Sequence, residues 1–307
     1  MVQVCVNGAR DGADGAVVPL SPGAMADSVA EAVAAGATDV HVHPKTPCGR
    51  DTLSPRALEA TLEAIRARIP ARVPVGVTTG AWAEPDPAAR VARIRSWTVL
   101  PDHASVNWHE PGAEETAAAL IERGVAVEAG VWSGTDGAAR FLRSPLGPKV
   151  LRVLAEVTDT DPATARDSAC ALLGGVVRIR PAPGDGASPP TREGCDACSC
   201  ETEEGAGAEP RQPTTTPQMG VPDPATPAGS ERHPLTGLVT AHGRPVLLHG
   251  EDGGAWPVLR LAGRLGLATR IGLEDTLFLP DGSRAASNAE LVTAAVAEWT
   301  SARRGDG

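Results

Sequence analysis

The chain has 307 residues, a formal net charge of -10 and a sequence pI near 5.2. This acidic balance argues against nucleic acid or an anionic membrane as a partner recruited by bulk charge. No apolar run approaches the ~20 residues of a membrane-spanning helix, and the first residues, MVQVCVNGAR, lack a basic leader. We therefore expect a soluble, cytoplasmic protein without a signal peptide.

Short β-branched segments alternate with Ala-, Leu-, Glu- and Arg-rich segments along most of the chain. The predicted strands, in chain order, are VQVCVNG, DVHVHP, VPVGVTTG, ASVNWHE, VAVEAGVWS, VLRVLAEVTD, PVLLHGED and ATRIGLED. The predicted helices between them include PGAMADSVAEAVAAG, SPRALEATLEAIRARIP, EETAAALIERG and WPVLRLAGRLG. Several of these segments end at a glycine, which is typical of a helix C-terminus.

Residues 181–232 interrupt this alternation. Ten of these 52 residues are proline, and the only large apolar residues are Met219 and Val221. Such a segment cannot bury enough apolar surface to offset the entropy of ordering the chain. We expect a disordered insertion, or a surface loop, within one domain that comprises residues 1–307.

Eight strand–helix units predict an α/β fold of the (β/α)8 TIM barrel type, with the long Pro/Gly-rich insertion before the seventh strand. An open doubly wound sheet is the alternative. That fold would usually carry a G-x-G-x-x-G fingerprint after its first strand. The sequence NGARDGADG does not match this fingerprint, so the barrel is favoured.

Polar residues concentrate where the predicted strands end, which is where barrels of this type carry their functional groups. They are Asn7, His41, His43, Thr78, Thr79, Asn107, His109, Glu110, Glu128, Glu156, Asp159, His249, Glu251, Glu274 and Asp275. Any barrel needs some polar residues in its loops, but this concentration exceeds that need.

The sequence HVH predicts half of a metal site. Residues i and i+2 of a strand face the same side, so His41 and His43 project together, as in many Zn²⁺ sites. A hydrogen-bonded histidine pair is the alternative. The eighth strand closes the barrel beside the first, which would bring Glu274 near the pair and complete a catalytic zinc site. His249 and Glu251 are rival ligands by the same reasoning.

Spacing alone leaves the charged residues around Glu274 ambiguous. Glu274 and Asp275 would each also suit the first turn of a helix, where the dipole favours acids. Arg270 and Glu274 are four residues apart, so on an extended strand they would face the same side but lie ~13 Å from each other. An arginine inside a barrel needs an acidic partner, so Arg270 predicts a structural ion pair or a charge that activates a carboxylate.

The insertion carries two motifs of its own. Cys195, Cys198 and Cys200 gather in CDACSC, and His233 could complete a metal site with them. No paired C-x-x-C accompanies the cluster, so a redox-exposed loop is favoured. The sequence PQMGVPDPATP predicts either a spacer or a ligand for a partner domain.

The ordered set of motifs resembles the beta-keto acid cleavage enzyme family. The matching pieces are NGAR, HVHP, VTTG, ASVNWHEPGA, VEAGVW, LAEVTD, LLHGEDGGAWP and TRIGLEDTLFLPDGSRAASNAELV. The resemblance implies a (β/α)8 barrel with one divalent metal, usually Zn²⁺, and a homotetramer. It also implies a retro-Claisen-type reaction, in which a β-keto acid and acetyl-CoA give acetoacetate and a new acyl-CoA.

The resemblance also implies residue roles. His41, His43 and Glu274 match the family's metal ligands. Asp275 matches its catalytic base, and Arg270 matches the arginine that assists this base.

Substrate contacts follow in the same way. Thr78 matches a Ser/Thr of the family that contacts the substrate. Ser105 and Asn107 fall in the motif of the fourth strand, and either of them could contact the substrate.

Two positions depart from the family pattern. The founding member has an acid at the position of Arg10, matched there to the ammonium group of its substrate, so we expect this chain to favour β-keto acids with an uncharged or anionic tail. Lys45 and Thr46 replace an Arg-Asp pair that the family often carries, which leaves the contacts of that loop open. The alternatives are another metal-dependent TIM-barrel lyase or hydrolase, or a non-catalytic relative.

Overall fold

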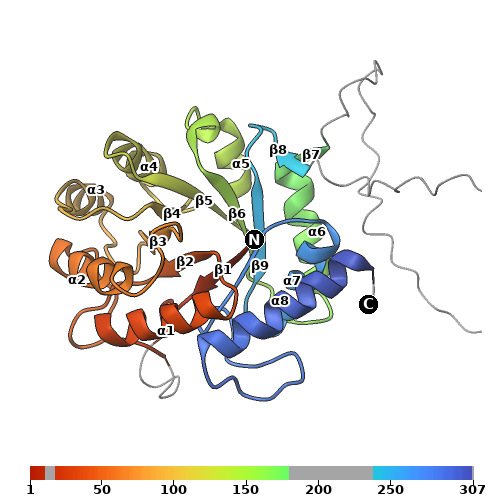
Figure 1. The fold of residues 1–307 in the computed structure, drawn as a ribbon. Coiled ribbons are helices and arrows are strands. Elements are labelled where there is room, and N and C mark those ends of the chain that lie inside the picture. Colours follow the sequence, from red (N-terminus) through yellow and green to blue (C-terminus); the bar gives the residue numbers. More distant parts are fainter. Residues whose placement is uncertain (11–17, 180–237, 306–307) are drawn as a thin grey trace, which may run out of the picture.

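The computed structural model describes residues 1–10, 18–179 and 238–305 (Figure 1). The predicted insertion, with its cysteine cluster, His233 and its proline-rich motif, falls outside these described residues. No helix within the described ranges is long and apolar enough to span a membrane.

Eight parallel strands form the central sheet in the order β10-β1-β2-β3-β4-β5-β6-β9. Their bounds are β1 (Val2–Cys5), β2 (Asp39–Val42), β3 (Val75–Thr78), β4 (His103–Asn107), β5 (Ala126–Trp132), β6 (Arg152–Val157), β9 (Val246–Gly250) and β10 (Thr269–Ile271). A parallel bridge between Leu247 and Ala268 joins the two edge strands. The sheet therefore closes into a barrel, which confirms the (β/α)8 prediction and shows the open doubly wound alternative to be wrong.

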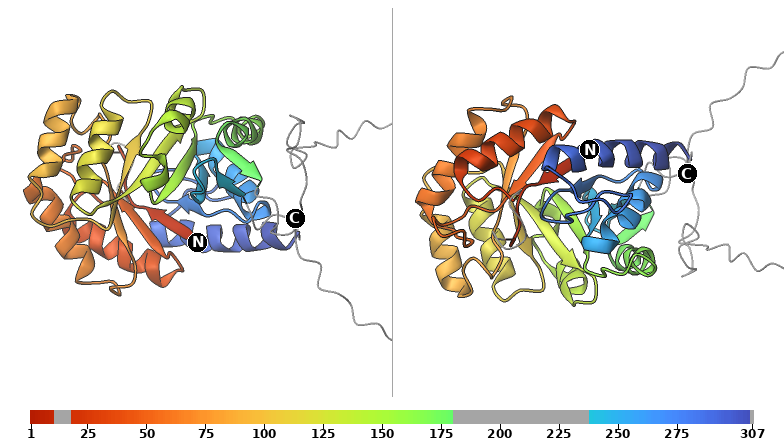
Figure 2. Two further views of the ribbon diagram at one scale, coloured as in Figure 1. Left: turned by 90° about the horizontal axis from the view of Figure 1, so that it is seen from above. Right: turned by 90° about the horizontal axis from the view of Figure 1, so that it is seen from below.

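Helices cover the outside of this barrel (Figures 1 and 2). They are α1 (Pro22–Ala34), α2 (Pro55–Arg66), α3 (Pro87–Arg95), α4 (Ala113–Glu122), α5 (Gly137–Arg143), α6 (Ala165–Val176), α7 (Ala255–Arg264) and α8 (Asn288–Arg304). A proline in the first turn favours the starts of α1, α2 and α3. The Ser21 and Asp86 side chains cap α1 and α3 by accepting from backbone N–H groups.

Alternate side chains of a barrel strand point to opposite sides of the sheet, either toward the helices or into the barrel. Val40 and Val42 of β2 belong to the apolar core that lies between the sheet and the helices. His41, between them, is buried on the opposite side, inside the barrel. The alternation in the sequence therefore directs the polar side chains of β2 inward.

An antiparallel hairpin of β7 (Val177–Ile179) and β8 (Leu238–Thr240) lies outside the barrel and was not predicted. Its pairing places Ile179 opposite Leu238. This pairing brings β8 next to β7, which directly follows α6. The next strand of the barrel after this pair is β9.

Buried charges fill the barrel interior near the starts of β2, β4, β5 and β6. His103 lies 2.9 Å from Asp39 and 3.2 Å from Glu128, and Arg152 contacts both acids. Burial lowers the pKa of His103, but the two acids outweigh this effect and raise it to about 10. The placement of Glu128 at the functional strand ends was wrong, because β5 extends from 126 to 132 and Glu128 lies near its start.

Candidate active site

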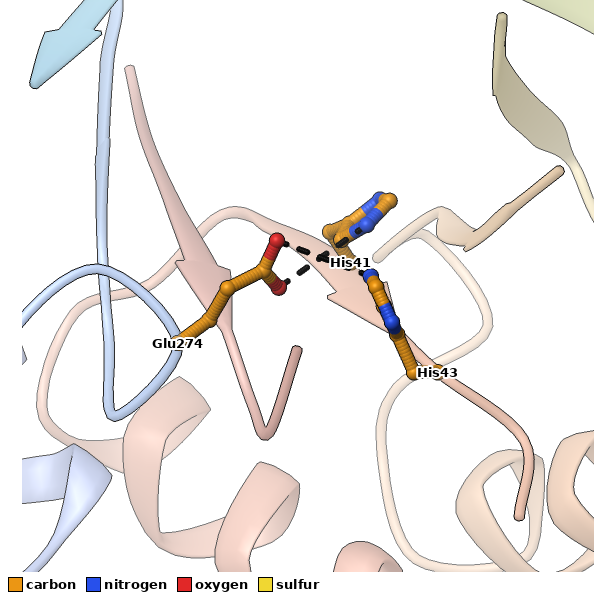
Figure 3. Close-up of side chains that lie close together, drawn as sticks. All are labelled: His41, His43 and Glu274. Carbon is orange, nitrogen blue, oxygen red and sulfur yellow. Dashed lines mark ion pairs between the residues drawn. The ribbon is translucent and has the colours of Figure 1, made fainter. Parts of the chain in front are cut away.

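The structure brings together the three predicted metal ligands (Figure 3). His41 Nε2 lies 3.9 Å from Glu274 Oε2, and His43 Nε2 lies 3.5 Å from Glu274 Oε1. One ligand atom from each residue falls within a mutual distance of 4.8 Å. Among the described residues, His249 and Glu251 do not belong to this group.

A turn directly after β10 carries Glu274 to the histidines. The strand ends at Ile271, and the N–H groups of Asp275 and Thr276 both donate to the carbonyl of Gly272. A Cβ atom at Gly272 would overlap the Cys5 carbonyl of β1, so only glycine permits this close crossing.

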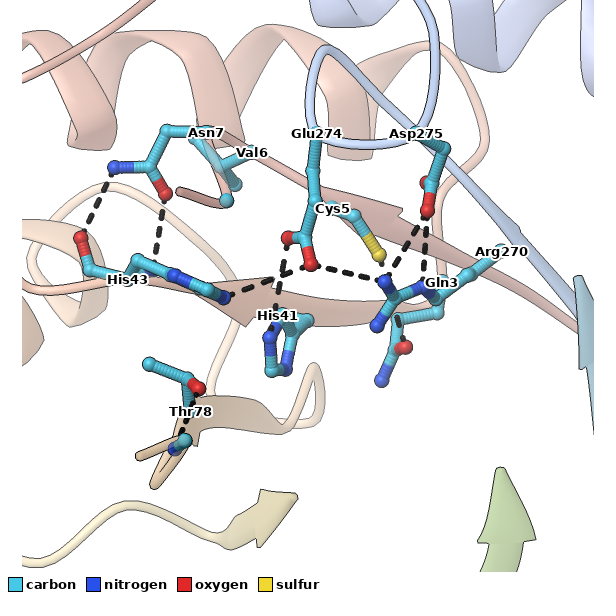
Figure 4. A network of polar contacts seen from close by, with 12 residues as sticks. Gln3, Cys5, Val6, Asn7, His41, His43, Thr78, Arg270, Glu274 and Asp275 are labelled. Carbon is cyan, nitrogen blue, oxygen red and sulfur yellow. Dashed lines mark hydrogen bonds and ion pairs between the residues drawn. The ribbon is translucent and has the colours of Figure 1, made fainter. Parts of the chain in front are cut away.

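The same turn brings Arg270 to the carboxylates (Figure 4). Its guanidinium lies 2.9 Å from Glu274 Oε1 and 3.2 Å from Asp275 Oδ1. The expectation of ~13 Å for an extended strand was wrong, because β10 contains only three residues and the chain folds back over Arg270.

The His43 imidazole is oriented by Asp51, a residue that the sequence analysis missed. Asp51 Oδ1 lies 3.1 Å from His43 Nδ1. Because a carboxylate only accepts, Nδ1 carries the proton and Nε2 remains available toward Glu274. The Asn7 side chain fixes the His43 backbone, accepting from its N–H (2.9 Å) and donating to its carbonyl (3.0 Å).

Lys45, whose role the sequence left open, ties this loop to the segment that follows β1. Its buried ammonium group donates to Asp51 Oδ1 (3.0 Å) and to the carbonyl of Gly8 (2.5 Å). Thr46 pairs with Arg50 through the backbone (2.7 Å) and also accepts the Arg50 N–H on its hydroxyl (3.1 Å). The loop therefore forms a small hairpin that holds Asp51 against His43.

The protonation states of His41 and Glu274 suit metal ligands, whereas His43 favours its protonated form. Burial lowers the pKa of His41 to about 3, so its imidazole is neutral at pH 7. Burial raises the pKa of Glu274, but Arg270, His43 and His41 outweigh it and hold this pKa well below the usual range. Burial lowers the pKa of His43, but Glu274 and Asp51 raise it overall, so a metal would compete with a proton for this ring.

Two buried atoms of the group need a partner. Neither His41 Nδ1 nor Glu274 Oε2 has a hydrogen-bond partner among the described residues. Leaving such polar atoms unpaired is costly, and a cation would satisfy the glutamate oxygen. Two imidazoles and one carboxylate are a donor set typical of catalytic Zn²⁺ and of related divalent metals. The residues present therefore fit a divalent metal.

A cavity of about 350 Å³ opens beside this group. It is lined by Ala9, Arg10, His43, Trp82, Trp132, Glu156, Glu251, Asp252 and Glu274. The two tryptophans, which the sequence analysis did not single out, form an aromatic wall, since Trp82 stacks on His43 with ring centroids 5.9 Å apart and lies 6.4 Å from Trp132. Arg10 donates to Asp252 (2.9 Å) and to the Glu274 carbonyl (3.2 Å).

The other predicted site residues lie at varying distances from this cavity. Asp275 is buried beside Arg270 and the His249 ring. Thr78, Ser105 and Asn107 are buried on β3 and β4 but do not line the cavity. Thr78 accepts from the Gly80 N–H, and Asn107 donates to the Glu110 carboxylate. Their contact with a substrate remains a prediction.

A model of the beta-keto acid cleavage enzyme family matches residues 1–133 and 239–304. Among proteins with a curated description, none matches this chain.

The similar solved structures include two complexes of ObcA. The ternary complex with C4-CoA adduct and oxalate aligns with a TM-score of 0.55 at 15% identity, covering 94% of this chain and 64% of that chain. The binary complex with oxaloacetate gives a TM-score of 0.51 at 16% identity, covering 92% and 63%. This chain thus spans less than two thirds of ObcA, and the likeness shows the fold. Because the family model matches well over half of its residues, the chain belongs to the beta-keto acid cleavage enzyme family.

Proposed function

We propose that this protein is a Zn²⁺-dependent enzyme that converts a β-keto acid and acetyl-CoA into acetoacetate and a new acyl-CoA. The observation that carries the proposal is the convergence of His41, His43 and Glu274 beside Arg270 and Asp275, in a chain of this family. A metal held by the first three residues would supply a Lewis acid that polarises a carbonyl.

Asp275 is the base in this proposal. It would take a proton from the carbon between the keto and carboxylate groups of the substrate. Arg270 Nε donates to Asp275 Oδ1 (3.2 Å) and fixes the orientation of the carboxylate. Burial of Asp275 keeps bulk water away from the proton that it takes.

The reaction balances without water. The deprotonated carbon forms a bond to the acetyl carbonyl, and the CoA thiolate leaves. The thiolate then adds to the original keto carbon, and the bond between this carbon and the deprotonated carbon breaks. The proton held by Asp275 returns to acetoacetate, so the acyl part of the keto acid ends as the new thioester.

Substrate binding is proposed for residues on both sides of the metal group. Arg10, at the cavity, would face the distal end of the substrate. Thr78, Ser105 and Asn107 would approach it from β3 and β4. A homotetramer and a cytoplasmic location complete the proposal, and light scattering of the purified protein tests the former.

An isotope experiment tests the function. The zinc-loaded protein is incubated with acetyl-labelled acetyl-CoA and a panel of β-keto acids, and the products are identified by mass spectrometry. We expect the label in acetoacetate and an unlabelled new acyl-CoA. Label in free acetate, without any new acyl-CoA, would instead identify a hydrolase.

A further inference from the structure

Trp82 presents an aromatic ring to solvent next to the metal group. Its exposed fraction is 43%, which places it among the few exposed large hydrophobic side chains of the described residues. It lines the cavity of about 350 Å³ beside His43 and Glu274, and also a neighbouring cavity of about 440 Å³ that Arg50 and Asp51 line. The indole is therefore a wall common to both cavities. Apolar surface left open to water at such a place is available to a ligand.

The turn between β3 and α3 folds the indole back over its own backbone. A Cβ atom at Gly80 would overlap the Trp82 ring, so the glycine leaves room for the ring to lie there. The ring is nearly parallel to the His43 imidazole, with an interplanar angle of 9° and centroids 5.9 Å apart. The Ala83 N–H closes the turn by donating to the Gly80 carbonyl at 3.0 Å. The position of the indole beside His43 thus depends on the position of this turn.

The Glu110 carboxylate holds this turn from inside the protein. Both of its oxygens accept from the Ala81 N–H, at 3.1 and 3.0 Å. Arg90 of α3 donates to Oε2 at 2.7 Å, and Asn107 of β4 donates to Oε1 at 2.9 Å. The Glu110 and Arg90 side chains are only 7% and 1% exposed. One buried carboxylate therefore joins β4, α3 and the residue that precedes Trp82.

This buried ion pair defines a geometry more than it adds stability. The cost of removing both charges from water offsets much of their attraction. Displacing the turn, however, would leave the buried carboxylate and the Ala81 N–H without each other, which is costly. Glu110 is not among the residues that line either cavity. Its contacts therefore indicate that it acts on a ligand only through Trp82.

We propose that Trp82 binds the carbon tail of the β-keto acid, and that Glu110 is the positioning residue that holds the indole for this contact. The inference rests on the proposed function, in which the keto carbonyl lies at the metal group and the tail begins at the keto carbon. The tail must then pass the side chains next to His43, and Trp82 is the apolar side chain stacked on that ring. The substrate class that this surface favours is a β-keto acid with an extended alkyl tail, because each methylene removed from water adds to binding.

Calorimetric titration of the metal-loaded protein, without acetyl-CoA, measures this contact without turnover. The probes are straight-chain β-keto acids that differ by one methylene each. We expect the wild type to gain roughly 2- to 4-fold in affinity per methylene, and Trp82→Ala to lose most of this gain. Phe278→Ala removes another exposed aromatic ring, which lines neither cavity, and this matched control should keep the gain. An equal gain per methylene in Trp82→Ala and in the wild type would overturn the proposal.

The role of Glu110 is tested in an Arg90→Met background, which removes the buried cation that would otherwise lose its partner. Glu110→Gln keeps an oxygen that can accept from the Ala81 N–H, whereas Glu110→Leu has none. We expect the Gln variant to retain the gain in affinity per methylene and the Leu variant to lose it, with equal metal content in both. Equal gains in these two variants would overturn the positioning role.

Turnover separates a failure of this inference from a failure of the proposed function. With acetyl-CoA present, kcat/KM should rise with tail length in the wild type, and Trp82→Ala should leave the KM for acetyl-CoA unchanged. A change confined to the KM for acetyl-CoA would overturn the proposal, because Trp82 would then contact the thioester. If affinity follows tail length through Trp82 but no β-keto acid gives a new acyl-CoA, the proposed function is refuted while the contact with the tail stands.

Discussion

Replacing Asp51 with alanine should weaken metal binding without touching a metal ligand. The carboxylate accepts from His43 Nδ1 at 3.1 Å and so keeps Nε2 directed toward Glu274. Removing a group that hydrogen-bonds a metal-ligating histidine typically lowers the metal affinity about 10–100-fold. This corresponds to about 1.4–2.7 kcal/mol of binding free energy. We expect a loss in this range for Asp51→Ala.

The same substitution should also lower the free energy of unfolding. Lys45 would lose its charged partner at 3.0 Å while its side chain is only 1% exposed. An uncompensated buried charge costs about 3–5 kcal/mol. The carbonyls of Gly8 and Arg10 still accept from the Lys45 ammonium, so we expect the lower end of that range.

A double variant separates the two effects. Asp51→Ala combined with Lys45→Met removes both charges, so stability should recover while metal affinity stays low. Competition titration against a chelator gives the affinity, and urea unfolding of the metal-free protein gives the stability. Wild-type metal affinity in the double variant would refute the reasoning, because Asp51 would then act only as the partner of Lys45.

Three further predictions address the base, the buried charges and the substrate. Arg270→Lys should lower kcat roughly 10²-fold while metal content is retained. The reason is that an ammonium group cannot bridge the Glu274 and Asp275 carboxylates as the guanidinium does. Steady-state kinetics together with metal analysis checks this, and an unchanged kcat would contradict it. The raised pKa of His103 contributes stability that is complete below pH 6.5 and lost as the pH rises through about 10. Urea unfolding should therefore show a decline over this window in the wild type and a weaker decline in His103→Gln, and equal slopes would contradict the assignment. Arg10 should favour an uncharged or anionic substrate tail over an aminated one, although Asp252 offsets part of its charge. Arg10→Glu should therefore shift kcat/KM toward the aminated substrate. An unchanged substrate preference would argue against contact between Arg10 and the substrate tail.

The sequence predicted those parts of the site that depend on regular periodicity. The eight strands were recognised from their β-branched runs, and the parity of HVH placed His41 and His43 on the inner face of β2. Barrel closure next to the first strand then placed Glu274 beside them, because β10 pairs with β1. These inferences rest on geometry that every strand of a barrel shares.

The parts that the sequence did not predict depend on contacts of irregular segments. The turn at Gly272, which sets the distance from Arg270 to the carboxylates, exists because the chain crosses β1 closely. Asp51 reaches His43 only through the hairpin that begins at Lys45. No periodic pattern encodes such contacts, since they arise from tertiary packing of loops.

The central claim is that the group of His41, His43 and Glu274 holds the metal on which acetoacetate formation depends. The most direct test removes the metal with a chelator and titrates Zn²⁺ back while acetoacetate formed from a β-keto acid and acetyl-CoA is measured. We predict that activity rises in proportion to bound metal, and that His43→Ala neither binds the metal nor forms acetoacetate. Full activity in the metal-free protein, or an active metal-free His43→Ala variant, would contradict the account.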